Sequence, residues 1–162
     1  MAGSSELVGL SPTERAFLRA LQSQGVPFMV VGIAAARLQG APVVTEDLDL
    51  WFAEGQQAGI AAAAKEAGVV YVPAGVAMNP PTFGGRGVRL DQVLSMSGLA
   101  SFDEELANTT VREVNGIPLR VLDLERIIES KRAANRDKDR AVLPALEAAL
   151  VALRSRERTH QK

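Results

Sequence analysis

Cysteine is absent from this sequence of 162 residues, and histidine occurs only once, as His160 near the C-terminus. Without cysteine there can be no disulfide, no thiolate nucleophile and no zinc site built on thiolates. A single histidine in a charged tail also argues against Ser-His-Asp triads, histidine acid–base catalysis and histidine-ligated metals. Any chemistry must therefore depend on carboxylates, lysine and arginine.

Long apolar runs and an excess of charge of one sign are missing as well. No apolar run approaches the roughly 18 residues that span a bilayer, and the N-terminal MAGSSELVGL lacks the pattern of a signal peptide, so we expect a cytoplasmic protein without a membrane segment. The net charge of −1 gives no overall attraction to nucleic acid. The locally basic stretch from Arg126 to Arg140 fits a solvated helix face as well as a polyanion-binding surface.

The stretch from Pro27 to Phe52 contains the most informative pattern. An apolar run ends at Gly32, an alanine-rich segment follows, and a second apolar run carries Asp47 and Asp49. Residues two apart in a strand lie on the same face, so the two carboxylates converge. Like charges at close range raise each other's pKa unless a cation lies between them, and oxygen ligands favour a hard ion such as Mg²⁺. The alternative is a chance D-x-D triplet whose side chains are solvated or cap a turn.

The whole chain reads as alternating helices and strands. Ser11 and Pro12 open the first helix, and Asn115-Gly116 marks a hairpin with a type I′ turn. We expect Asp123 to cap the next helix, and Pro144 to kink or restart the last one, with a frayed polar tail from Arg154. The expected elements are helices at about 12–24, 33–39, 56–67, 102–107 and 137–155, strands at 26–31, 47–52 and 87–94, and a strand and loop over 69–87. This order predicts a single α+β domain, with an ordered core of about residues 11–153, in which helices, including C-terminal ones, flank a mixed sheet.

Two further residues are candidates for the same site. Asp91 becomes a third carboxylate if its strand lies beside the strand of Asp47 and Asp49. Lys131 follows the inward-packing Ile127 and Ile128 on one helix face, which would leave its ammonium free to reach the cleft, although an exposed helix lysine is the plain alternative.

The pattern as a whole resembles the minimal nucleotidyltransferase fold, in particular bacterial proteins related to the AbiEii-type nucleotidyltransferase toxins. The resemblance rests on VVGIAAARLQGAPVVTEDLDLWF, on VRLDQVLSMSGLASFDEE and on VNGIPLRVLDLERIIESKRAANRDKDR, and it covers about residues 14–150. It implies that Asp47, Asp49 and Asp91 are the metal-binding and catalytic carboxylates. It also implies that the nucleotide is bound by Gly32, Ile33, Thr45 and Lys131, with Asp139 near the site.

Three positions depart from the family pattern. Ile33 replaces a small residue at the glycine turn, Gln39 replaces a histidine before Gly40, and Val43 replaces an arginine. A small residue at the turn would let backbone amides approach phosphates closely, whereas Ile33 adds bulk beside them.

The leading hypothesis is a nucleotidyltransferase that depends on Mg²⁺ or Mn²⁺ and moves a nucleoside monophosphate from a triphosphate to an acceptor hydroxyl. The resemblance suggests RNA, especially a tRNA 3′ end, as the acceptor, and an antitoxin as a partner; a protein side chain or an aminoglycoside-like molecule is equally open. The alternative is a catalytically silent binding protein of the same fold. A D-x-D-x-T phosphatase is disfavoured by Trp51, and a Rossmann domain by the lack of G-x-x-G spacing after Gly32.

Overall fold

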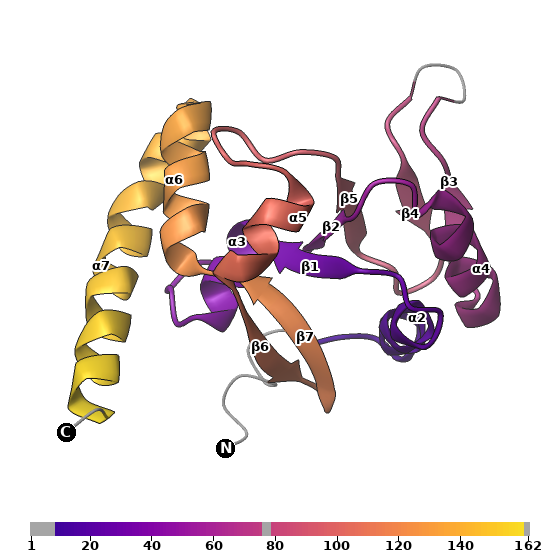
Figure 1. The fold of residues 1–162 in the computed structure, drawn as a ribbon, viewed down its shortest axis with the longest axis horizontal. Coiled ribbons are helices and arrows are strands. Elements are labelled where there is room, and N and C mark those ends of the chain that lie inside the picture. The colour runs from indigo at the N-terminus through magenta and orange to yellow at the C-terminus, as the bar shows by residue number, and fades with distance from the viewer. Residues whose placement is uncertain (1–8, 76–78, 161–162) are drawn as a thin grey trace.

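The computed structural model describes residues 9–75 and 79–160. Within them, five strands form one mixed sheet in the order β5-β2-β1-β7-β6 (Figure 1). In that order the strands are Leu90–Val93, Leu48–Phe52, Phe28–Val31, Ile117–Leu122 and Thr109–Val114. The β1–β7 and β2–β5 pairs are parallel, whereas β1–β2 and β6–β7 are antiparallel. The predicted mixed α+β sheet is confirmed.

Helices and a small ribbon surround this sheet. Figure 1 places α6 and α7 side by side at one end of the molecule, and α2, α4 and the β3–β4 ribbon at the other. The helices are α2 (Pro12–Ser23), α3 (Gly32–Leu38), α4 (Gln57–Ala67), α5 (Phe102–Glu105), η2 (Leu106–Asn108), α6 (Leu124–Ala134) and α7 (Asp137–His160). The ribbon pairs β3 (Val70–Val72) with β4 (Thr82–Gly84), so part of the predicted loop is a strand. None of the described helices is both long and apolar enough to cross a membrane.

Local sequence explains several of these boundaries. The Ser11 hydroxyl accepts from the Glu14 amide, while the Glu14 carboxylate accepts from the Ser11 amide, which is the predicted capping box. Asn115 and Gly116 both have positive φ, as the predicted type I′ turn requires. The central strand β1 is buried along its whole length, so the sheet and the helices share a continuous apolar core.

The end of the chain differs from the prediction. Helix α7 continues through Pro144 to His160, so neither a restart at this proline nor a frayed tail from Arg154 is observed. Burial of Leu146 and Ala149 and ion pairs from α6 to α7 offset the missing backbone donor of the proline. These ion pairs are Arg132 with Glu147 and Arg154 with Glu125.

The cap of α6 is also different. Asp123 is its N-cap residue, but the carboxylate accepts a hydrogen bond from the Thr110 hydroxyl rather than from a helix amide. The Leu124 amide instead donates to the side chain of Gln39, 2.8 Å away. The cap is therefore supplied from α3.

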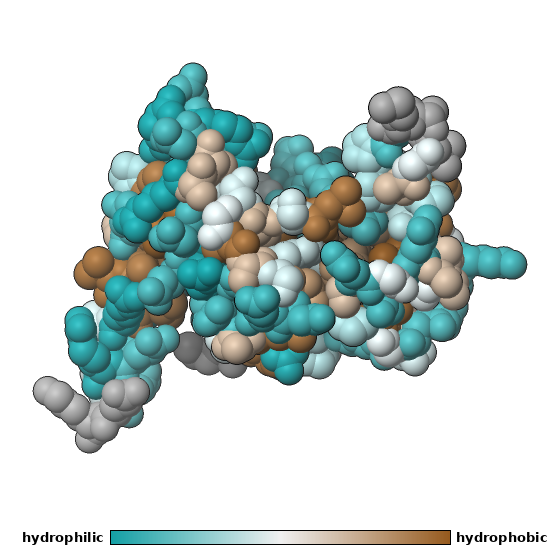
Figure 2. Space-filling view, turned by 45° about the horizontal axis from the view of Figure 1, so that its top comes forward, coloured by the Kyte–Doolittle hydropathy of each residue, from teal (hydrophilic) through white to brown (hydrophobic). Residues whose placement is uncertain are grey.

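The surface drawn in Figure 2 is largely hydrophilic, with small scattered hydrophobic patches. Among the described large apolar side chains, Val44 is the most exposed, at 85%. It lies in the segment between α3 and β2, which also carries Thr45 and Asp47.

Candidate functional site

Two adjacent strands bring Asp49 and Asp91 together. Strands β2 and β5 run parallel, and Asp49 is in register with Asp91. The neighbourhood that the sequence required for a third carboxylate is therefore present. Across the other edge of β2, Asp49 is in register with Val31, the last residue before the glycine turn.

Asp47 precedes β2 and is exposed, rather than being the first strand residue as expected. Its position is set by the loop from α3. The Thr45 hydroxyl donates to the Asp47 carbonyl at 2.9 Å, and the Arg37 guanidinium donates to the Val43 carbonyl at 3.2 Å. These two bonds fix the approach to β2, so Thr45 orients the backbone of Asp47.

Gly32 lies directly against Asp49. Its φ of +68° belongs to the left-handed region, and a Cβ at this position would lie 2.3 Å from a carboxylate oxygen of Asp49. Any other residue would meet both backbone strain and a clash. This explains why a glycine follows β1 beside the strand that carries Asp49.

Two cavities open beside these residues, and we name them by their contents. The acidic cavity, of about 380 Å³, contains the three aspartates among its described lining residues. The rest of its lining is Ile33, Val43, Val44, Thr45, Lys131, Lys138 and Val142. The cationic cavity, of about 260 Å³, is lined by Val31, Gly32, Asp49, Val93, Ser95, Met96, Ser97, Ser130, Lys131, Ala134, Arg136 and Lys138. Asp49, Lys131 and Lys138 line both, and between them the two cavities are lined by all seven residues predicted to bind metal or nucleotide.

The carboxylates in this region carry charge that the chain compensates poorly. Burial, followed by the charge of Asp91, raises the pKa of Asp49 to about 6, although Lys131 and Lys138 oppose this. Burial and then the charge of Asp47 raise the pKa of Asp91. Among the described residues, no ion pair or hydrogen bond reaches the side chain of either residue. A cation from outside the chain would relieve this repulsion.

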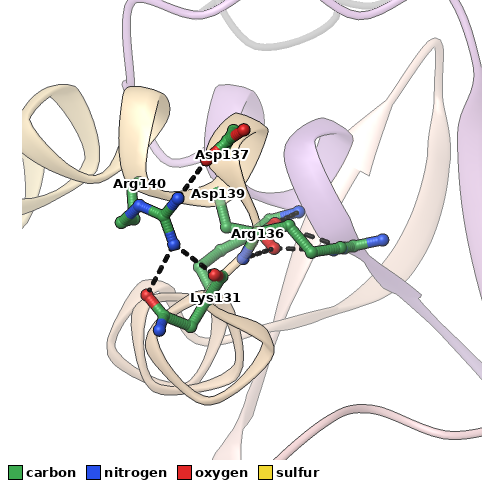
Figure 3. Close-up of polar contacts among 6 residues, drawn as sticks. Lys131, Arg136, Asp137, Asp139 and Arg140 are labelled. Carbon is green, nitrogen blue, oxygen red and sulfur yellow. Dashed lines mark hydrogen bonds and ion pairs between the residues drawn. The ribbon is translucent and has the colours of Figure 1, made fainter.

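Lys131 is not free, contrary to the expectation from sequence. Its ammonium pairs with the carboxylate of Asp139 (Figure 3), at a distance of 3.3 Å. Its side chain is only 18% exposed. Asp139 follows in the first turn of α7 and also binds Arg136 at 2.7 Å. Lys131 still lines both cavities, so the pairing leaves it in the site.

Sequence reasoning missed several residues of this region. Arg136 and Lys138 belong to the R-x-K-D segment that carried the resemblance, and this spacing was the signal that could have identified them. Ser95 and Ser97 also line the cationic cavity, but nothing in their sequence context distinguishes them.

The three departures from the family pattern have different structural roles. Gln39 is 4% exposed and donates to the Ala35 and Leu122 carbonyls while accepting from the Leu124 amide. It therefore joins α3 to β7 and α6. Ile33 and Val43 instead line the acidic cavity beside the aspartates.

The donor set suits a hard cation, because Asp47, Asp49 and Asp91 offer only oxygen and their mutual repulsion favours a positive ion. Across residues 9–75 and 79–160, no group of three or more His, Asp or Glu side chains is close enough to hold a metal by itself. Mg²⁺ commonly uses one or two carboxylates and completes its shell with waters and substrate phosphates. The residues present fit that mode of binding.

Comparison with known proteins identifies the fold. No protein-family model and no curated protein sequence matches this chain. Among solved structures, the crystal structure of ANT(2″)-Ia in complex with adenylyl-2″-tobramycin is similar with a TM-score of 0.54 at 18% identity, covering 88% of this chain and 95% of that one. The solution structure of the antibiotic-resistance factor ANT(2″)-Ia gives a TM-score of 0.53 at 18% identity, covering 92% of this chain and 93% of that one.

A third structure, an antigenic nucleotidyltransferase-like protein from Paracoccidioides brasiliensis, has a TM-score of 0.54 at 15% identity and covers 86% of this chain and 75% of that one. None of these three is described as an AbiEii-type toxin, so that narrower resemblance stays a prediction. At such identities the likeness concerns the backbone, and the chain has the nucleotidyltransferase fold.

Proposed function

We propose that the protein is a metal-dependent nucleotidyltransferase that moves a nucleoside monophosphate from a triphosphate to an acceptor hydroxyl. The observation that carries the proposal is the register of Asp49 with Asp91 beside Gly32, with both side chains lacking an ionic partner in the described part of the chain. The fold shared with two structures of ANT(2″)-Ia and with a nucleotidyltransferase-like protein supports it.

The reaction forms a bond from the acceptor oxygen to the α-phosphorus and breaks the bond from that phosphorus to the bridging oxygen of pyrophosphate. Asp91, the more exposed of the paired carboxylates, would accept the proton of the acceptor hydroxyl. Lys131 and Arg136 would bind the phosphates from the cationic cavity. Gly32 would let the Asp49 carboxylate lie against the turn, because the glycine has no side chain to displace it.

Asp47, Asp49 and Asp91 would hold Mg²⁺ or Mn²⁺ together with the nucleotide. When bound, the ion would neutralise the phosphates and make the acceptor hydroxyl more acidic. The raised pKa of Asp49 and of Asp91 supports this role, because burial first and neighbouring carboxylates second disfavour the charged form, which a bound cation would stabilise.

The acceptor is best sought among small hydroxyl compounds first. The acidic cavity joins three carboxylates to the apolar side chains of Ile33, Val43, Val44 and Val142. This lining is unfavourable for a polyanion such as RNA. The complex of ANT(2″)-Ia contains an adenylylated aminoglycoside, which makes aminoglycosides the first acceptors to test here. An RNA acceptor, with an antitoxin partner, is the second possibility that the sequence resemblance raises.

The test is transfer of label. Purified protein is given each α-labelled nucleoside triphosphate with Mg²⁺ or Mn²⁺, and separately an aminoglycoside panel, total RNA and total protein. We expect label to move to one acceptor pool. Asp47→Asn should abolish transfer, and Lys131→Ala should weaken it mainly through poorer triphosphate binding.

Absence of label with every nucleotide, both metals and all three pools would contradict the proposal. It would favour a catalytically silent protein of this fold. A Lys131→Ala variant as active as the wild type would remove that lysine from the phosphate site.

A further inference from the structure

A fully buried carboxylate lies directly behind the cations of the candidate site. Asp139 is 0% exposed and accepts from the Arg136 side chain at 2.7 and 3.2 Å and from the Arg136 amide at 3.0 Å. The Lys131 ammonium lies 3.3 Å away (Figure 3). These hydrogen bonds, those of Arg136 above all, hold the pKa of Asp139 well below its usual range. The carboxylate is therefore ionised, and the three side chains together carry a single positive charge.

The cluster also determines where the two cations lie. Lys131 is in the last turn of α6, Asp139 is in the first turn of α7, and Asn135 between them has the left-handed conformation that ends α6. Arg136 and Lys131 line the cationic cavity, whereas Asp139 lines neither that cavity nor the acidic one. The carboxylate thus acts through the cations rather than on a ligand.

We propose that Asp139 is a positioning residue that holds Lys131 and Arg136 as a preset pair for the polyphosphate of the nucleotide. This inference rests on the proposed function for the identity of the ligand. Lysine and arginine side chains lose considerable rotamer freedom when they are fixed on a ligand. A carboxylate that fixes them during folding removes that cost from the binding step, which is how preorganisation raises affinity.

The chain contains a matched control for this carboxylate. Glu105 is 1% exposed and binds the Arg126 guanidinium through two contacts of 2.8 Å, and Arg126 also lies on α6. Glu105 and Arg126, both within the described part of the chain, line neither the acidic nor the cationic cavity. If Asp139 only joined α6 to α7, its loss should resemble the loss of Glu105.

The experiment measures binding of inorganic tripolyphosphate by titration calorimetry without metal, at a temperature where every variant is folded. Asp139→Asn and Glu105→Gln should both lower the melting temperature, because each replaces a buried carboxylate that accepts charge-assisted hydrogen bonds from an arginine. Only Asp139→Asn should weaken tripolyphosphate binding, by about tenfold or more, while Glu105→Gln should stay within about twofold of the wild type. Equal affinities for the two variants, or tighter binding by Asp139→Asn, would overturn the proposal.

Single removals of the cations test the same idea if Asp139→Asn does not fold. Lys131→Ala and Arg136→Ala should each weaken tripolyphosphate binding, whereas Arg132→Ala should not. Arg132 is the control because it is an exposed cation on α6 that pairs with Glu147 and lines neither cavity within the described structure. Unchanged affinity in both Lys131→Ala and Arg136→Ala, or no binding by the wild type, would overturn the inference.

Binding of tripolyphosphate needs no chemical step, so the two proposals can fail separately. Wild-type binding that depends on Asp139, with no transfer of label to any acceptor, would contradict only the proposed function. Transfer of label by a protein whose tripolyphosphate affinity is independent of Asp139 would contradict only this inference.

Discussion

The protein contains two kinds of carboxylate with a shifted pKa. Asp139 and Glu105 are almost fully buried, yet arginine partners lower the pKa of both, that of Glu105 to about 2. Asp49 and Asp91 have raised pKa values, because burial and neighbouring carboxylates act on them without a direct cationic partner in the described structure. The first kind stabilises the fold at neutral pH, and the second destabilises it.

This difference between the two kinds of carboxylate indicates where an ion from solution would bind. A carboxylate that already has a cationic partner in the folded chain needs no ion from solution, as Glu105 with Arg126 shows. A pair of carboxylates held in register against a glycine turn is costly unless a ligand balances it. In the described structure the buried carboxylates of Glu14, Glu105 and Asp139 all accept hydrogen bonds. Carboxylates without such partners, gathered at one place, are expected at a functional site.

The largest effect expected is on transfer. Asp49→Asn should reduce it by about a thousandfold, since several kcal/mol of transition-state stabilisation by the metal would be lost. The same change should leave the metal-free protein as stable as the wild type or more stable, because it removes an uncompensated charge. Asp139→Asn should lower stability, so the two variants should change the free energy of unfolding in different ways.

Asp103→Asn is the control for Asp49→Asn, because Asp103 is exposed on α5. Transfer rates and urea unfolding curves in EDTA give both readouts. Transfer by Asp49→Asn at the rate of Asp103→Asn would contradict the assignment of Asp49.

The next largest effect concerns Gln39, a buried neutral side chain whose amide makes three hydrogen bonds. Gln39→Leu should lower the free energy of unfolding by about 2–4 kcal/mol, because the Ala35 and Leu122 carbonyls and the Leu124 amide would lose buried partners. Gln57→Leu, at an exposed position of α4, should change it by less than about 0.5 kcal/mol. Equal chemical denaturation midpoints for the two variants would mean that Gln39 does not join α3 to α6.

The pH dependence of stability should separate the two kinds of carboxylate. The pKa of Asp49 is raised to about 6 in the folded protein, so the folded state binds its proton more tightly than the unfolded state does. Metal-free stability should therefore fall as pH rises from about 4 to 6, by about 2 kcal/mol from this group. Glu105, whose pKa is lowered to about 2, acts in the opposite direction and loses its contribution as pH falls below about 4.5.

Urea unfolding in EDTA between about pH 4 and 7 measures this dependence. Asp49→Asn should be flatter than the wild type from about pH 4 to 6. Parallel curves of unfolding free energy against pH for the two proteins would show that the pKa of Asp49 is not raised and that its charge does not destabilise the fold.

The smallest effect expected is at Ile33, which is half-buried and lines the acidic cavity. Ile33→Ser should tighten triphosphate binding about threefold in the presence of Mg²⁺, because it removes bulk and adds a hydroxyl beside the turn. Val142→Ser, on the same cavity but from α7, is the control and should have no such effect. Unchanged or weaker affinity for Ile33→Ser by calorimetry would mean that Ile33 serves packing alone.

Local signals predicted much of the fold, while the assignment of the three aspartates to a metal site stays a prediction. The Ser11 cap, the Asn115-Gly116 turn and the buried β1 strand each depend on residues close in sequence, and each is observed. The register of Asp49 with Asp91 was stated as a condition, because strand pairing depends on contacts distant in sequence.

The errors share that cause. The cap on Leu124 comes from Gln39, 85 positions away, and Lys131 is paired because α7 folds back along α6 to bring Asp139 beside it. Helix α7 tolerates Pro144 because packing and ion pairs to α6 outweigh local propensity. None of these contacts leaves a periodic signal in the sequence.

The most direct test of the account is the response of thermal stability to a divalent cation. EDTA-treated protein is unfolded with and without Mn²⁺ or Mg²⁺ in excess, for the wild type, Asp49→Asn and Glu105→Gln. We predict a rise of several degrees for the wild type and for Glu105→Gln, because the ion binds only the folded carboxylate site, and no rise for Asp49→Asn. Equal responses of the wild type and Asp49→Asn would contradict the claim that the uncompensated carboxylates hold the metal.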